Sequence, residues 1–289
     1  MKRCLNFKKQ NFLSIFCLFR RNFKERESAN MKITTLVENT TLDEKLSCEH
    51  GLSLYIETKK HKILFDMGQT DLFVENARKL DVDLADVDIA ILSHGHYDHG
   101  GGLKKFLEIN QKAPVYLSKH AFEPYYNGAE KYIGLDVSLR ESERLIYTDD
   151  VIEITEGLKL FHCNSHEKSY DLGSFGLNKK VNDEFLPDDF LHEQYLLIEE
   201  NDKKVLISGC SHKGILNIVE WFKPDVLIGG FHFSKLPLDD TLTGYARILD
   251  GFDTEYYTCH CTGIEQYQFM KKQMKKLFYI GTGEVNYIV

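Results

Sequence analysis

The 289-residue chain lacks several features that would define its class directly. Its seven cysteines are odd in number and contain no CxxC pair, so the sequence indicates neither a disulfide framework nor a zinc ribbon. Its 36 basic residues are outnumbered by 44 acidic ones, which disfavours nonspecific attraction to nucleic acid. No fixed-period repeat or Pro-rich linker divides the chain. We therefore expect one domain, cytoplasmic and without a nucleic-acid partner.

Long apolar runs are also scarce. Residues 12–19 form an apolar run within a basic N-terminal stretch, but this run is far shorter than the roughly 18 apolar residues that a spanning helix needs. Two arginines follow it, where a signal peptide would have a small-residue cleavage site. We expect residues 1–30 to be a disordered or mis-annotated extension, residues 31–289 to form the domain, and no membrane to be a partner.

Short strand-like runs alternate with helical patterns, which is typical of an α/β protein. Two stretches, residues 121–150 and 167–189, have weak periodicity or many Gly, Asn and Asp residues, and we expect them to be loops over a site. Strands are predicted over residues 32–37, 52–58, 62–65, 87–92, 158–161, 194–199, 204–208, 225–228 and 255–258, and helices over residues 70–80, 213–221 and 263–276.

One motif, SHGHYDHGGG at residues 93–102, follows a predicted buried strand and holds three of the twelve histidines within six positions. His94 and His96 are two residues apart, so an extended backbone places both imidazoles on one side, where they can share a metal ion. Asp98 and His99 follow, and the glycines allow a turn that directs them at a second ion nearby. Imidazole and carboxylate ligands suit zinc, manganese or iron, and two such ions roughly 3.5–4 Å apart are typical of hydrolytic centres.

Further histidines follow later predicted strands. His212, His232 and His260 each lie just beyond a strand end, which is where a site at one edge of a sheet draws its residues. We expect His212 and His260 to be metal ligands. His232 is interpreted as a residue that contacts the substrate or orients a ligand.

At these residues the sequence resembles the metallo-β-lactamase superfamily, whose H-x-H-x-D-H signature matches SHGHYDH. The segments EHGLSLYIET, ILFDMGQ, LISGCSHKGILNIVE, IGGFH and HCTG resemble more narrowly the branch often labelled dihydropterin ribofuranosylaminobenzene phosphate synthase. The resemblance covers the chain from about residue 31 to its C-terminus. It implies a four-layer αββα sandwich with metals at one edge.

The resemblance also implies a ligand set. One metal would be held by His94, His96 and His212, and the other by Asp98, His99 and His260. The superfamily usually has Gly-Asp where this chain has Gly209 followed by Cys210, so the bridge between the metals is either the Cys210 thiolate or hydroxide alone. His166 follows another predicted strand and is the alternative to His212. Asp66 is expected to orient neighbouring histidines by hydrogen bonds.

Three functions are consistent with these residues. The first is a metal-dependent hydrolase with two divalent ions, chiefly zinc, in which Asp98 ligates a metal and orients the attacking water against a small-molecule ester or phosphoester. The second is a transferase like the dihydropterin synthase. The third is a protein that binds metal and ligand without turnover. The sequence leaves a homo-oligomer open.

Overall fold

The computed structural model describes residues 31–288, and the expected extension over residues 1–30 lies outside the described residues. Within residues 31–288 the strands form two seven-stranded sheets and one four-stranded sheet. The first sheet has the order β18 (Val285–Ile288), β1 (Met31–Val37), β2 (Ser53–Glu57), β3 (Lys62–Phe65), β4 (Ile89–Ile91), β5 (Val115–Ser118), β8 (Leu145–Thr148). The second has the order β17 (Leu277–Tyr279), β16 (Glu255–Thr258), β15 (Val226–Gly229), β14 (Lys203–Ile207), β13 (Tyr195–Glu200), β10 (Leu158–Phe161), β9 (Val151–Thr155). The small sheet has the order β12 (Glu184–Pro187), β11 (Leu177–Val181), β6 (Tyr125–Asn127), β7 (Lys131–Tyr132).

The apolar residues of the central strands alternate between two cores, because successive side chains on a strand point to opposite faces. On β3, Ile63 and Phe65 pack in the core between the two large sheets, whereas Leu64 packs in the core under the helices of the first sheet. On β14, Ile207 faces the same central core and Leu206 faces the helices of the second sheet. Both sheets are therefore buried on both faces, as a sandwich with outer helices requires.

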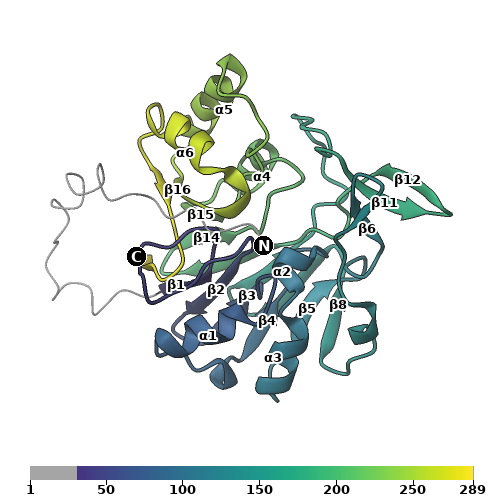
Figure 1. The fold of residues 1–289 in the computed structure, drawn as a ribbon. Coiled ribbons are helices and arrows are strands. Elements are labelled where there is room, and N and C mark those ends of the chain that lie inside the picture. The colour runs from purple at the N-terminus through teal and green to yellow at the C-terminus, as the bar shows by residue number, and fades with distance from the viewer. Residues whose placement is uncertain (1–30, 289) are drawn as a thin grey trace, which may run out of the picture.

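The helices form the outer layers (Figure 1). The first sheet is covered by α1 (Leu72–Lys79) and α3 (Leu103–Ile109), and the second by α4 (Ile215–Phe222), α5 (Asp240–Asp250) and α6 (Ile264–Lys271). The short helices are α2 (Tyr97–Gly100), η2 (Leu84–Asp86), η3 (Val137–Leu139) and η4 (His260–Thr262). The αββα sandwich expected from the sequence is confirmed. Over residues 31–288, no helix has the length and apolar character needed to cross a membrane.

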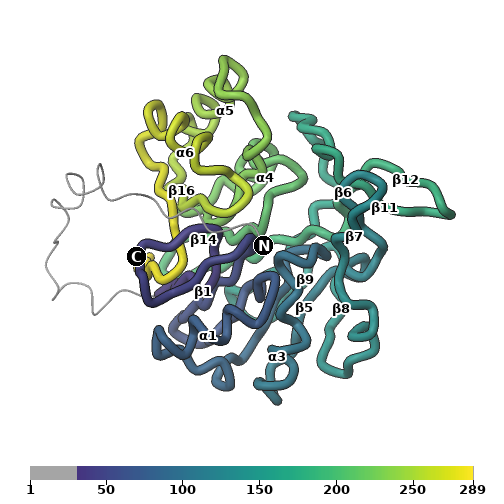
Figure 2. Tube along the Cα trace, viewed as in Figure 1, coloured from purple at the N-terminus to yellow at the C-terminus, as the bar shows by residue number. Residues whose placement is uncertain are grey.

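The strand directions place the carboxyl ends of several parallel strands at a common edge of each sheet. In the first sheet β3, β4, β5 and β8 are parallel, and in the second β14, β15, β16 and β17 are parallel. Ligand sites in such sheets form outside the carboxyl ends of the parallel strands. The tube in Figure 2 also shows β1 beside the C-terminal end of the described chain, because β1 pairs with β18.

Most of the expected strands and helices are present, but α3, β5, β9, β17 and β18 were not expected, and the structure differs in several further places. The predicted loop over residues 121–150 contains β6, β7, η3 and β8, and that over residues 167–189 contains β11 and β12, so both predictions are wrong in part. These strands have two to five residues and are largely exposed, so they lack the apolar alternation that would reveal them. The helix expected over residues 263–276 ends at Lys271, where the chain turns toward β17. Helix α5 was not expected, although Asp239 caps it by accepting hydrogen bonds from the Thr241 and Leu242 backbone N–H groups.

A glycine at the end of β15 provides a test of this packing. Gly229 has a φ of +144°, and a Cβ built there would lie 1.8 Å from the Ser208 carbonyl oxygen. Gly229→Ala is therefore expected to lower the free energy of unfolding by about 3 kcal/mol through strain and overpacking. The measurement is urea denaturation. Gly244→Ala is the matched control, because Gly244 lies inside α5 with open space around its Cα, and it should stabilise the protein by roughly 0.5–1 kcal/mol. Equal effects of the two variants would contradict the packing described.

Candidate metal centre

The loop between β4 and α2 supplies the first group of histidines. His94 and His96 lie on it with ring centroids 4.6 Å apart, and both are buried. His212, which follows β14, joins them: its Nε2 is 3.3 Å from the His94 Nε2, and the ligand nitrogens of all three histidines lie within 4.8 Å of one another. The structure thus brings together His94, His96 and His212, the three residues that were expected to share one ion.

Asp98, His99 and His260 meet beside this first group. Asp98 and His99 lie on α2, and His260 lies at the start of η4, just beyond β16. The Nε2 of His260 is 3.2 Å from the His99 Nε2 and 3.4 Å from the Asp98 Oδ2. All three side chains are almost completely withdrawn from solvent. His260 therefore lies next to both Asp98 and His99, but these three residues do not form one ligand group within residues 31–288. Asp98 and His260 group with His50, and His99 groups with His94 and Cys210.

The second ring nitrogens of three histidines are anchored by neighbouring polar groups. The His99 Nδ1 is 2.7 Å from the Asp66 Oδ2, the His260 Nδ1 is 2.8 Å from the Asn39 Oδ1, and the His94 Nδ1 is 2.8 Å from the Ser93 Oγ. These contacts fix the ring orientations and turn each Nε2 toward the cluster. Such anchoring of the outer nitrogen is typical of metal-binding histidines.

Asp66 joins the two strand ends that carry the first motif. It follows β3 with a φ of 60°, and its fully buried carboxylate accepts hydrogen bonds of 2.7 Å from both the backbone N–H and the hydroxyl of Ser93. Together with the contact to His99, these bonds match the orienting role expected from the sequence.

The electrostatics leave the lone pairs of His94 and His212 available to a cation. Burial, reinforced by neighbouring histidines, lowers the pKa of both His94 and His212 well below the usual range, so these rings are neutral. Burial opposes ionisation of Asp98, but its contacts with His260 and His50 outweigh burial and lower its pKa, so the carboxylate is charged. The Nε2 of His96 is buried without a hydrogen-bond partner. Neutral imidazoles, a carboxylate and an unpartnered buried nitrogen form a donor set that fits divalent metal ions.

The thiol of Cys210 lies at the boundary of the cluster. Its Sγ is 3.2 Å from the His99 Nε2, and it forms one ligand group with His94 and His99 and another with His232 and Cys261. The ring of His232 is 4.4 Å from that of His212, so this residue also borders the expected ion positions. Cys210 thus lies close to one member of each expected ligand set, His94 and His99, and stays one of the two candidates for the bridge.

Two other histidines of the motif regions have different surroundings. His166, the alternative to His212, is exposed and its ring lies 5.3 Å from that of Trp221. Across residues 31–288 it belongs to none of the ligand groups. His50 is exposed and forms an ion pair of 3.1 Å with Asp98, which places it at the outer side of the cluster, where it forms a ligand group with Asp98 and His260.

Two residues that support the loop of His94 and His96, Asp188 and His192, were not predicted from the sequence. The His192 Nδ1 accepts a 2.8 Å hydrogen bond from the Gly95 N–H, and its Nε2 contacts the Asp188 Oδ2 at 3.2 Å. The His96 Nε2 lies 3.7 Å from the same carboxylate oxygen. The one signal in the sequence was a His-Glu-Gln run at the start of a predicted strand, three polar residues that are all fully buried.

Glu193, from that same run, fixes the chain on either side of His212. Its buried carboxylate accepts hydrogen bonds from the backbone N–H groups of His212 (2.6 Å) and Lys213 (2.9 Å) and from the Tyr195 hydroxyl (2.6 Å). Lys213 is also buried, and its Nζ donates to the Glu193 carbonyl oxygen. Burial lowers the pKa of Lys213 to about 8, while the charge of Glu193 opposes this shift. The carboxylate of Glu193 therefore offsets part of the cost of burying the charged Lys213 side chain.

Aromatic residues beyond the histidines close the site on the side of the small sheet. Phe190 stacks on the ring of His212 at 4.6 Å, and Tyr125 of β6 stacks on the ring of His192 at 3.9 Å. Phe190 and Tyr125 belong to one apolar cluster with Leu177 of β11. The segments expected to be loops therefore pack behind the site through a small sheet.

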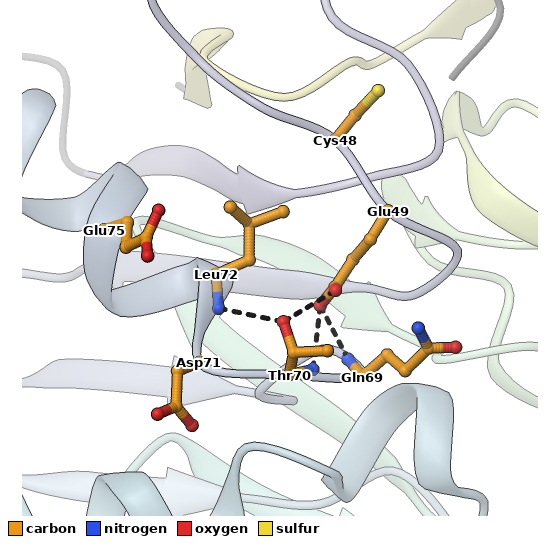
Figure 3. A pocket seen from close by; sticks show the side chains of 7 residues that line it. All are labelled: Cys48, Glu49, Gln69, Thr70, Asp71, Leu72 and Glu75. Atoms are coloured by element: carbon orange, nitrogen blue, oxygen red, sulfur yellow. Dashed lines mark hydrogen bonds between the residues drawn. The ribbon is translucent and has the colours of Figure 1, made fainter. Parts of the chain in front are cut away.

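A surface pocket adjoins the site at the segment before His50. In Figure 3, the Glu49 carboxylate bridges this segment to the turn before α1. It accepts hydrogen bonds from the backbone N–H groups of Gln69 and Thr70 and from the Thr70 hydroxyl. The remaining lining residues are Cys48, Asp71, Leu72 and Glu75. The carboxylate of Glu49 is thus engaged in holding the loop that carries His50.

The burial of Glu193 gives a stability prediction. Glu193→Gln removes the charge that compensates buried Lys213 and weakens several hydrogen bonds, so the free energy of unfolding should fall by about 3 kcal/mol. Glu156→Gln is the control, because Glu156 forms an exposed ion pair with Lys60 and should change stability by less than about 1 kcal/mol. Denaturant unfolding compares the two variants. A Glu193→Gln protein as stable as the control would show that the buried pair contributes nothing.

Comparison with known proteins agrees with the fold. The model of the metallo-beta-lactamase superfamily matches residues 46–248. A solved metal-dependent hydrolase of the beta-lactamase superfamily, Tm1679, superposes with a TM-score of 0.75 at 30% identity, covering 89% of this chain and 99% of that one. Two proteins of Methanocaldococcus jannaschii are similar in sequence. One is an uncharacterized protein, 34% identical over 81% of this chain and 91% of its own length. The other is the 7,8-dihydropterin-6-methyl-4-(beta-D-ribofuranosyl)-aminobenzene-5'-phosphate synthase, 26% identical over 86% of this chain and 93% of its own length. The chain belongs to the metallo-beta-lactamase superfamily.

Proposed function

We propose that this protein is a metal-dependent hydrolase that acts on a small-molecule ester or phosphoester. His94, His96 and His212 would hold one divalent ion, and Asp98, His99 and His260 would hold a second. The histidine-rich donor set favours zinc, while manganese and iron match the same ligand types. The observation that carries this proposal is the convergence of these buried side chains, with the outer nitrogens of His94, His99 and His260 anchored so that each Nε2 faces the cluster.

In the proposed reaction the metal ions would activate water, and side chains of the protein would orient that water and bind the substrate. Bound divalent ions would lower the pKa of a coordinated water to about 7 and so supply the nucleophile at neutral pH. The Asp98 carboxylate, charged and placed between His50 and His260, would orient that water. His232, beside His212, would contact the substrate. The aromatic backing by Phe190 and Tyr125 keeps bulk water away from the histidine side of the site.

The relatives support two related activities. The solved structure with 30% identity is described as a metal-dependent hydrolase, which favours the main proposal. The synthase of Methanocaldococcus jannaschii, at 26% identity, favours a second candidate, a transferase that joins a pterin to a phosphorylated ribosylaminobenzene. A protein that binds metal and ligand without turnover is the third candidate, and the complete donor set argues against it.

The identity of the third histidine of the first ion is tested by a pair of variants. His212→Ala is expected to lower zinc affinity strongly in calorimetric titration of metal-depleted protein and to abolish turnover of any substrate found. His166→Ala, the matched control, should retain both, because His166 is exposed beside Trp221. The reverse pattern would assign the ligand position to His166.

Asp66 tests the anchoring of the cluster. Asp66→Asn keeps the size of the side chain but removes the charged acceptor of His99 and Ser93. Zinc affinity should fall roughly 10- to 100-fold, the usual cost of losing a group that orients a ligand. Titration with zinc measures this, and Asp88→Asn on an exposed ion pair with Lys112 serves as the control. Unchanged affinity in Asp66→Asn would contradict the anchoring role.

Hydrolase and synthase activities are separated by a direct assay of the zinc-loaded protein. A panel of p-nitrophenyl acetate, bis(p-nitrophenyl) phosphate, a thioester and a lactone reports hydrolysis of single substrates. Condensation in the second candidate requires both the pterin and the ribosylaminobenzene substrates and releases pyrophosphate. Turnover of one panel compound, lost in His94→Ala, would support the hydrolase. Pyrophosphate release that depends on both substrates would replace it with the transferase.

A further inference from the structure

Three neighbouring parallel strands of the second sheet are each followed, at the same distance along the chain, by a residue that can bind a metal ion. Cys210 is the third residue after β14, His232 the third after β15 and Cys261 the third after β16. Because β14, β15 and β16 are adjacent and parallel, equal offsets from their carboxyl ends place these residues beside one another. The arrangement is a consequence of the sheet and does not depend on the first motif.

The three side chains converge. The Sγ atoms of Cys210 and Cys261 and a ring nitrogen of His232 all lie within 4.8 Å of one another. Both cysteines are buried, and the Cys261 Sγ is 3.5 Å from the Cys210 carbonyl oxygen. The His232 Nδ1 is buried and has no hydrogen-bond partner. Two thiols and an unpartnered imidazole nitrogen are a donor set for a metal ion.

The backbone around these residues is shaped to let the thiol approach. A Cβ at Gly230 would lie 2.3 Å from the Cys261 Sγ, so only glycine at that position leaves room for the sulfur. His232 itself has a φ of 58°, a left-handed conformation that costs free energy in a non-glycine residue. Strain of this kind at a cluster of donor atoms is common where a ligand is held.

The cluster extends beyond the six side chains of the proposed two-metal function. Cys261 is in neither proposed ligand set, and Cys210 connects the two regions because its Sγ also lies 3.2 Å from the His99 Nε2. A sulfur atom can bridge two cations, so occupation of one region is compatible with occupation of the other. Thiolates prefer soft or borderline cations, which distinguishes this position from one built of imidazole and carboxylate alone.

We propose that Cys210, His232 and Cys261 form an additional site for a soft or borderline divalent cation such as zinc or cadmium, adjoining the two-metal centre and sharing Cys210 with it. The proposal rests on the proposed function for the two neighbouring ions. It assigns the paired cysteines of the GCSH and HCTG segments to metal binding, and it makes His232 a metal ligand in place of a residue that contacts the substrate.

Cadmium binding to the metal-depleted full-length chain, kept under a thiol-free reductant, tests this site. The wild-type protein is expected to bind three equivalents of cadmium and to show an ultraviolet thiolate-to-cadmium charge-transfer band. Cys261→Ser should bind two equivalents and lose part of the band. Cys163→Ser is the control, because Cys163 is buried in the core under α4 and α5 and belongs to none of the ligand groups among residues 31–288, so it should bind three.

Each contrary result has a separate meaning. Two equivalents in both the wild type and Cys261→Ser would overturn the additional site and leave the two-metal function standing. Failure of the wild type to bind cadmium or zinc would overturn both. Should Cys261→Ser fail to fold, cadmium NMR of the wild type decides: a resonance in the range of an ion with two sulfur ligands supports the site, and resonances of nitrogen and oxygen ligation alone contradict it.

Discussion

Burial of mutually facing imidazoles is the constraint on which the rest of this structure depends. His94, His96, His99, His212 and His260 are removed from water, and pairs of their Nε2 atoms face one another at 3.2–3.3 Å. Burial lowers the pKa of His94 and His212, whereas the Asp66 carboxylate raises the pKa of His99 to about 9 against the effect of burial. Removing so many imidazoles from water is costly, and a bound cation would offset part of that cost. The surrounding hydrogen bonds of Asp66, Ser93 and Asn39 hold the rings against this cost.

The two-sheet architecture explains how distant segments reach one site. The carboxyl ends of β3 and β4 in the first sheet deliver Asp66 and the His94 loop, while β14, β15 and β16 in the second deliver the later histidines and cysteines. The central core between the sheets fixes their relative position, since Phe65 and Ile207 pack in the same cluster. The small sheet then adds aromatic side chains behind the site. The packing that stabilises the sandwich therefore also fixes the geometry of the site.

Many strands of the two large sheets, and the site residues that follow them, could be predicted from the sequence, because buried parallel strands occur as apolar runs followed by polar residues. His94 and His212 each follow such a run, and His260 follows the half-buried strand β16; the common edge of parallel strands explains why the three meet. Asp188 and His192 could not be predicted in the same way. They lie in an irregular segment before β13, and their roles depend on contacts with Gly95 and His96, roughly a hundred positions away in the chain. The strands β6, β7, β11 and β12 were not predicted for a different reason: short exposed strands show no apolar alternation in the sequence.

The metal content of the full-length protein, purified without added metal and measured by elemental mass spectrometry, tests the central claim most directly. We predict at least two equivalents of zinc, manganese or iron per chain, because the buried imidazole and carboxylate donors fit divalent cations. Less than one equivalent per chain, persisting after reconstitution with each of these metals, would contradict it.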